Sequence, residues 1–201
     1  MAEETATNQE MLACRACGSS DLALVIDLGV QALTGLFPPS PEEVVPQAPL
    51  QLVRCGGECG LVQLRHSCDA ATMYGAAYGY RSSLNRSMIR HLRRRIEAVQ
   101  RHVTLGAEDL VVDIGSNDGT LLKGYPACGL RKIGIDPTAA RFREFYGEDV
   151  TIVPEFFSSD AVRGAANGQL AKVVTSIAMF YDLDEPLEFM REIHKILEPE
   201  G

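Results

Sequence analysis

The second half of the chain alternates short apolar runs with segments of helical spacing. The apolar runs are Leu110–Ile114, Arg131–Ile135, Val150–Val153 and 172–177. Short runs rich in valine and isoleucine are typical of buried strands, and strands that alternate with helices form parallel sheets. The pattern therefore predicts an α/β domain with about four parallel strands.

Two further segments have the spacing of amphipathic helices. The first carries apolar residues every three or four positions, at Leu84, Met88, Leu92, Ile96 and Val99. We expect this helix to bridge two domains. The second has Asp184 as a candidate N-cap and Pro186 near its first turn. Its apolar side consists of Leu187, Met190, Ile193 and Leu197. It ends in a Pro-Glu-Gly turn where another strand should follow, so we expect the sheet domain to be truncated.

Paired cysteines dominate the region before these elements. Cys14 and Cys17 form a C-x2-C knuckle, Cys55 and Cys59 form a C-x3-C knuckle, and a glycine follows each pair. Two such pairs can close a tetrahedral thiolate site around zinc, and four protein ligands would make that zinc structural. The alternative is two pairs of free thiols. His66 is a candidate substitute ligand.

The remaining cysteines, Cys68 and Cys128, stand alone and are interpreted as small buried apolar residues. A proline-rich stretch at 37–41 is predicted to be a loop. The predicted organisation is a small zinc-binding domain over 1–70, a connecting segment with an amphipathic helix over 71–105, and a cofactor-binding domain over 106–201.

A glycine-rich loop follows the first predicted strand of the sheet domain. Gly115 and Gly119 permit close backbone approach of a ligand, and Asn117 stands where many such loops have another glycine. Asparagine tolerates left-handed backbone geometry better than most residues. A strand, a tight loop and a following helix are the geometry of a nucleotide-type cofactor site, although a turn without a ligand is the simpler alternative.

An acidic residue at the end of the next predicted strand supports a cofactor. Asp136 could accept both ribose hydroxyl protons of an adenosine, an arrangement that NAD and S-adenosylmethionine sites share. Asp113 favours S-adenosylmethionine, because its carboxylate could hold the amino-acid end of that molecule. The candidate cofactor residues are Asp113, Gly115, Ser116, Asn117, Asp118, Gly119, Asp136, Pro137 and Phe156, the last as a flank for the adenine.

Composition narrows the function classes. The 201 residues carry a net charge of -8 and the pI is near 5.0, which argues against a duplex nucleic-acid binder and favours a small ligand. The first ten residues are polar and acidic, so they predict neither a signal peptide nor a membrane span. We therefore expect a cytoplasmic protein, in which six cysteines act as metal ligands or apolar residues rather than as disulfides.

Taken together, these motifs resemble a known group, the sugar C-methyltransferases with an N-terminal zinc-binding domain, a central methyltransferase domain and a C-terminal domain. The matching segments are the two cysteine knuckles with 59–64, the tyrosine-containing segment 78–83, the loop 113–120 and the segment 134–137. The resemblance implies a Rossmann-like class I methyltransferase domain that binds S-adenosylmethionine, preceded by a structural zinc domain. Its substrate would be a nucleotide-linked keto-deoxysugar, and the oligomeric state is left open.

In that group, a base removes a proton beside a sugar ketone and the enolate attacks the cofactor methyl group. The resemblance places this base in a Glu-His pair on the C-terminal domain, beyond Gly201. The segment 178–183 departs from relatives that carry an asparagine and a histidine there. Weaker catalytic candidates within the chain are Tyr78, Tyr80, His91 and Asp182. The alternatives are an O- or N-methyltransferase and a non-catalytic fragment that binds zinc and cofactor.

Overall fold

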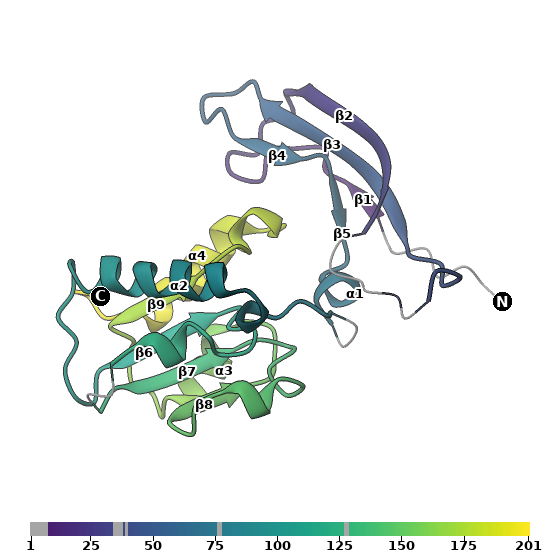
Figure 1. Ribbon diagram of the computed structural model, residues 1–201. Coiled ribbons are helices and arrows are strands. Elements are labelled where there is room, and N and C mark those ends of the chain that lie inside the picture. Colours follow the sequence, from purple (N-terminus) through teal and green to yellow (C-terminus); the bar gives the residue numbers. More distant parts are fainter. Residues whose placement is uncertain (1–7, 34–37, 39, 76–77, 127–128) are drawn as a thin grey trace. The chain divides into compact units, whose positions relative to one another are not determined.

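The computed structural model describes residues 8–33, 38, 40–75, 78–126 and 129–201. Two compact units are present, one formed by Met1–Gly79 with Phe180–Phe189 and the other by Tyr80–Met179 with Met190–Gly201 (Figure 1). Cys128 and part of the proline-rich stretch at 37–41 lie outside the described residues.

A four-stranded parallel sheet forms the centre of the second unit. Its strands are β6 (Leu110–Ile114), β7 (Arg131–Ile135), β8 (Val150–Val153) and β9 (Val173–Ser176), in the order β8-β7-β6-β9 (Figure 1). The predicted parallel sheet is confirmed. All five residues of β6 are buried, because a central strand has both faces covered.

The connections within the sheet differ from the prediction. The predicted helix after the glycine-rich loop is replaced by turns and a 3₁₀ turn at Leu122–Gly124, and a second 3₁₀ turn at Arg143–Phe145 connects β7 to β8. One helical hydrogen bond forms, from Lys123 N to the carbonyl of Gly119 at 3.0 Å. Gly124 and Pro126 then prevent the helix from continuing. An α-helix, α3 (Ser159–Ala165), connects β8 to β9.

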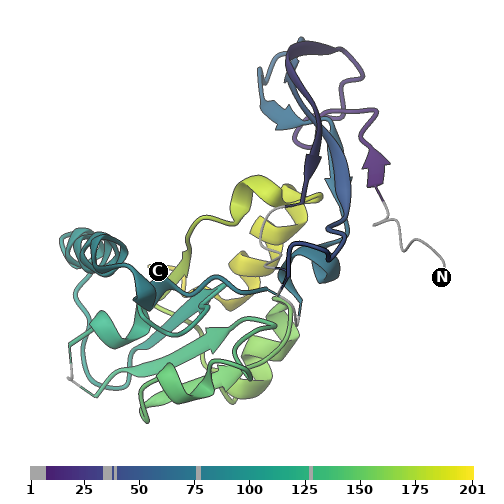
Figure 2. The same ribbon diagram turned by 45° about the vertical axis from the view of Figure 1, so that its right-hand side comes forward.

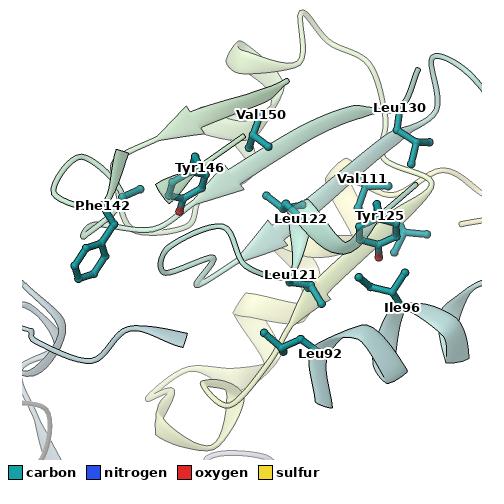
Figure 3. Packing of buried hydrophobic residues seen from close by; sticks show 12 residues of the cluster. Leu92, Ile96, Val111, Leu121, Leu122, Tyr125, Leu130, Phe142, Tyr146 and Val150 are labelled. Atoms are coloured by element: carbon teal, nitrogen blue, oxygen red, sulfur yellow. The ribbon is translucent and has the colours of Figure 1, made fainter. Parts of the chain in front are cut away.

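Helix α2 (Arg86–Val99) lies beside the sheet of its own unit (Figure 2). The side chain of Asn85 caps it by accepting a hydrogen bond from Ser87 N at 2.9 Å. Leu92 and Ile96 are buried in a cluster with Leu121 (Figure 3). The other members of this cluster are Val111, Leu122, Tyr125, Leu130, Ala139, Phe142, Tyr146, Val150 and Val173. The predicted amphipathic helix is therefore confirmed.

Leu84 and Asp184, which were predicted at the starts of the two amphipathic helices, lie outside these helices. Leu84 precedes α2 in the 3₁₀ turn Ser82–Leu84 and is 69% exposed. Helix α4 (Pro186–Ile196) starts at Pro186, as expected. Asp184 is one residue too early to cap it, and its carboxylate instead accepts a hydrogen bond from Ser67 and pairs with Arg15 at 3.6 Å. None of the helices in the described part of the chain is long and apolar enough to cross a membrane.

The first unit is built from antiparallel strands. Strands β2 (Leu22–Ala32), β3 (Gln47–Cys55) and β4 (Val62–Leu64) form one sheet, and β1 (Asn8–Glu10) pairs with β5 (His66–Cys68). Helix α1 (Ala70–Tyr74) follows and is capped by Asp69. The buried apolar residues described in this unit are Cys14, Ala48, Val53 and Cys55. So small a core requires another source of stability.

We predict that Leu92→Ala destabilises the protein by about 2–5 kcal/mol, because it leaves a cavity beneath α2. Leu84→Ala is the matched control, and its effect should stay within about 0.5 kcal/mol because the side chain is exposed. Urea denaturation followed by circular dichroism measures both changes. Equal losses for the two variants would contradict the assignment of α2.

Candidate functional site

Four cysteine sulfurs in the first unit converge on one point. The Sγ atoms of Cys14, Cys17, Cys55 and Cys59 all lie within 4.8 Å of one another. Cys14 to Cys59 measures 3.5 Å, Cys17 to Cys55 3.6 Å and Cys17 to Cys59 3.4 Å between sulfurs. Zinc–sulfur bonds of about 2.3 Å give a tetrahedral edge of about 3.8 Å. The cluster therefore fits a structural zinc ion, with all four coordination positions filled by protein.

Local turns orient the four cysteine sulfurs towards one another. Gly18 N donates to the carbonyl of Cys14 at 2.9 Å, and Gly18 adopts the left-handed φ of 74° that closes the first knuckle. Gly57 N lies 3.3 Å from the Cys55 sulfur in the second knuckle. Burial raises the pKa of Cys14, but donors from the Cys17 and Ala16 backbone and the neighbouring sulfurs outweigh it and lower the pKa to about 7. These donors also favour a metal-bound thiolate.

The substitute ligand candidates do not join this cluster. The described His, Cys, Asp and Glu side chains that group around the metal position are the four cysteines alone, so His66 is not among them. Cys68 is a half-buried free thiol, and its pKa is raised by burial and by the charge of Asp184.

The glycine-rich loop begins at the carboxyl end of β6 and has three left-handed residues. Gly115, Asn117 and Gly119 have φ values of 70°, 52° and 69°, so Asn117 adopts the geometry expected of it. A Cβ on Gly119 would lie 2.6 Å from the Tyr146 ring, and one on Gly115 would lie 3.0 Å from the Met179 sulfur. The loop therefore requires glycine at both positions.

Asp136 joins this loop to the end of β7. Its Oδ2 accepts from Asn117 N at 2.9 Å, while its Oδ1 accepts from Thr138 N at 2.7 Å and from the Thr138 hydroxyl at 2.5 Å. The residue is 8% exposed. Pro137 follows it, and together they form the turn after β7. A carboxylate has about four acceptor positions, so one remains on Oδ2.

Asp113 is the buried acid of β6. It is 4% exposed, and its Oδ1 accepts from the Thr175 hydroxyl of β9 at 2.7 Å. Burial raises its pKa to about 7, the hydrogen bond from Thr175 opposes that shift, and the charge of Asp136 adds to it. Near neutral pH this carboxyl group is therefore close to its titration point.

Tyr146 is a central residue that the sequence patterns did not indicate. Its hydroxyl lies 2.7 Å from Ser116 Oγ and donates to the carbonyl of Asn117 at 2.7 Å. Burial raises its pKa, so the phenol stays protonated. Thr138 and Thr175 were also missed. No motif includes any of the three, and only the fold brings them to the loop.

The remaining candidates are placed as follows. Phe156 follows β8 and is 48% exposed. In the second unit, Tyr80 accepts a hydrogen bond through its carbonyl from the Asn117 amide, and His91 lies exposed on α2. In the first unit, Asp182 accepts a hydrogen bond from Tyr74, and the Tyr74 ring meets Tyr78 edge-on at 5.5 Å. Burial raises the pKa of Asp182.

Comparison with known proteins finds a matching domain family and a similar curated protein. Residues 14–74 match a domain family described as "Putative zinc binding domain". The chain is 28% identical over 191 residues to the C-methyltransferase NovU of Streptomyces niveus, a match that covers 94% of this chain and 45% of the relative. The resemblance to methyltransferases with an N-terminal zinc-binding domain is confirmed. The chain thus spans about half the length of the curated relative that it matches.

Solved methyltransferase structures resemble this chain only weakly. An S-adenosylmethionine-dependent methyltransferase from Thiobacillus denitrificans, in complex with S-adenosyl-L-homocysteine, is 19% identical with a TM-score of 0.39, covering 55% of this chain and 45% of that one. Another from Agrobacterium tumefaciens is 13% identical with a TM-score of 0.37, covering 92% and 71%. Values this low carry no argument about function.

We predict that the zinc-binding unit holds one zinc ion and unfolds when a chelator removes it, because metal binding supplies the stability that its small core lacks. Cys17→Ser should lose zinc, whereas Cys68→Ser, a change of a nearby thiol outside the cluster, should keep it. Elemental analysis measures the metal, and hydrogen exchange of β3 measures folding. Protection of β3 that survives zinc removal would refute the prediction.

We predict that Asp113→Asn stabilises the sheet unit above neutral pH. In the unfolded chain the pKa of an aspartate is about 3.9, and the folded pKa of Asp113 is about 7. The native state therefore binds the extra proton between these values, and stability falls as pH rises through that window. The variant should remove this loss, which amounts to up to about 4 kcal/mol by pH 8.

The measurement is urea unfolding from about pH 4 to pH 8, read from hydrogen exchange of β6. Asp109→Asn is a control of opposite sign, because hydrogen bonds from Gly106 N and Lys172 lower the pKa of Asp109. That variant should lose stability at neutral pH and little at acid pH. An unchanged pH profile for Asp113→Asn would contradict the raised pKa.

Proposed function

We propose that the chain binds S-adenosylmethionine in the loop after β6 and forms the zinc-binding and cofactor-binding part of an enzyme that C-methylates a nucleotide-linked keto-deoxysugar. The observation that carries the proposal is the pairing of two neighbouring parallel strands. The glycine-rich loop follows β6, and Asp136 follows β7 at the same end of the sheet. Ligands of open parallel sheets bind outside the carboxyl ends of the strands.

The strand order supports the same location. The chain runs from β6 outward to β7 and β8 and returns to β9 on the other side of β6. This reversal is a topological switch point, where ligand crevices form. Thr175 of β9 bonds to Asp113 there, and Met179 comes within reach of the Gly115 backbone.

Gly115, Asp136 and Asp113 each have a defined task in this proposal. The backbone at Gly115 allows the cofactor to approach, and Asp136 Oδ2 uses its remaining acceptor position for one ribose hydroxyl. Asp113 lies in the same end of β6 and would balance the positive charge of the cofactor. A cation there favours the ionised form of Asp113 and lowers its pKa.

The curated relative supports carbon as the methylated atom, because NovU is a C-methyltransferase. A carbon beside a carbonyl can lose a proton and become the nucleophile that such a reaction needs. A keto-sugar linked to a nucleotide offers such a carbon. The cofactor, when bound, supplies the electrophilic methyl group. The zinc ion supplies structure to the first unit rather than chemistry, because its ligand shell is complete.

We predict that Asp136→Asn weakens binding of S-adenosylmethionine roughly ten- to a hundredfold, since loss of a charge-assisted hydrogen bond costs about 1.5–3 kcal/mol. Asparagine keeps an oxygen for the loop contacts. Asp109→Asn is the matched control, because that aspartate bonds Gly106 N and Lys172 before β6 begins. Isothermal titration calorimetry with S-adenosylmethionine and NAD measures the affinities.

Equal affinity of the wild type and Asp136→Asn would contradict the assigned site. Tighter binding of NAD than of S-adenosylmethionine would contradict the proposed class. The substrate is tested by transfer of a labelled methyl group to a nucleotide-linked keto-deoxysugar. This assay uses a protein that covers the whole length of NovU. Transfer to a hydroxyl or amine acceptor instead would contradict carbon methylation.

A further inference from the structure

The side chains of two loop residues hold the segment 80–83, which precedes α2. Asn117 Oδ1 accepts a hydrogen bond from Ser82 N at 2.9 Å, and Asn117 Nδ2 donates to the carbonyl of Tyr80 at 3.0 Å. Asp118 Oδ2 accepts from Ser83 N at 2.9 Å. Backbone groups of Tyr80, Ser82 and Ser83 are thus tied to the loop.

The loop side of these contacts is buried. Asp118 is fully buried, and its Oδ1 accepts from Thr120 N at 3.2 Å and from the Thr120 hydroxyl at 2.5 Å. Arg81 brings a positive charge to 3.9 Å from Asp118 Oδ2, and its guanidinium lies 3.8 Å from the centre of the Phe145 ring. The Asp118 carboxylate therefore serves the protein interior rather than a ligand.

Asn117 is part of the loop and also of the contact with the segment 80–83. Its backbone belongs to the loop, with its N–H bonded to Asp136 and its carbonyl bonded to Tyr146. Its side chain belongs to the contact with the segment 80–83. A ligand that fixes the loop backbone therefore also fixes the amide that holds the segment.

We propose that Asn117 and Asp118 are positioning residues that tie the segment 80–83 to the cofactor loop, so that cofactor binding orders this segment for the acceptor substrate. The coupling to cofactor rests on the proposed function. The hydrogen bonds themselves do not. Asn117→Gly removes both side-chain bonds and leaves the left-handed backbone unstrained.

The test is hydrogen exchange of the Ser82 and Ser83 amides, with and without S-adenosylhomocysteine. Asn117→Gly should speed exchange of Ser82 about tenfold, because its acceptor is lost. Asn167→Gly is the matched control, since Asn167 has a similar φ of 54° but lies exposed after α3. It should leave both amides unchanged. Asn117→Asp keeps an acceptor for Ser82 and should give an intermediate rate.

Addition of S-adenosylhomocysteine should slow exchange at Ser82 and Ser83 in the wild type and in Asn167→Gly. It should slow exchange much less in Asn117→Gly when both proteins are compared at saturating ligand, with saturation established by calorimetry. This separation of binding from ordering is something that a purely structural role would not produce. Exchange of the β6 amides confirms that the variant is folded.

Several outcomes would overturn the proposal. Wild-type exchange rates at Ser82 in Asn117→Gly would show that the side chain holds nothing. Ligand binding that leaves Ser82 and Ser83 unchanged in the wild type would remove the coupling. Absence of any ligand binding would refute the proposed function, while the ligand-free rates would still decide whether Asn117 holds the segment. If Asn117→Gly fails to fold, wild-type rates in Asn117→Asp overturn the proposal.

Discussion

The hydrogen bond from Asn117 N to Asp136 is the constraint on which the second unit's site depends. It joins the loop after β6 to the turn after β7, so two segments that are separate in sequence become one rigid edge. The bond needs a left-handed residue at position 117, which asparagine provides at modest cost. Tyr146 closes the arrangement from the other side by bonding the carbonyl of the same residue. The loop is thereby fixed by hydrogen bonds of the protein itself.

This edge also concentrates negative charge in a buried place. Asp113, Asp118 and Asp136 are all nearly inaccessible to water, and each is satisfied differently. Asp118 accepts hydrogen bonds from backbone N–H groups and lies near Arg81. Asp136 accepts from three donors. Asp113, by contrast, accepts a hydrogen bond from a neutral hydroxyl. The weakest solvation therefore falls on Asp113, which explains why its pKa is raised to about 7. A cationic ligand would stabilise the ionised form of Asp113 more than a neutral ligand would.

Sequence reasoning succeeded where the signal is local. Buried parallel strands such as β6 appear in the sequence as continuous apolar runs. The spacing of the paired cysteines predicts that their sulfurs can bind one metal ion. It failed where the outcome depends on distant partners. Asp184 looks like a helix cap, yet Arg15 and Ser67 bind it. Tyr146 lies in no motif, and its ring packs so closely on Gly119 that a Cβ there would lie 2.6 Å from it. The roles of Asp113 and Asp136 as cofactor ligands stay predictions.

The two units gain their stability from different sources, and this difference has a consequence for cooperativity. The sheet unit buries a continuous cluster between α2 and the strands, so its stability is set mainly by apolar burial. In the first unit, two of the four buried apolar residues described belong to the cysteine cluster that fits zinc, and the side chains of Leu24, Ile26 and Val30 on β2 are exposed. We therefore expect its stability to vary with zinc concentration by mass action, and that of the sheet unit to be independent of zinc. A single unfolding free energy is defined only for a two-state transition. The protein should therefore be described by two unfolding free energies, one for each unit.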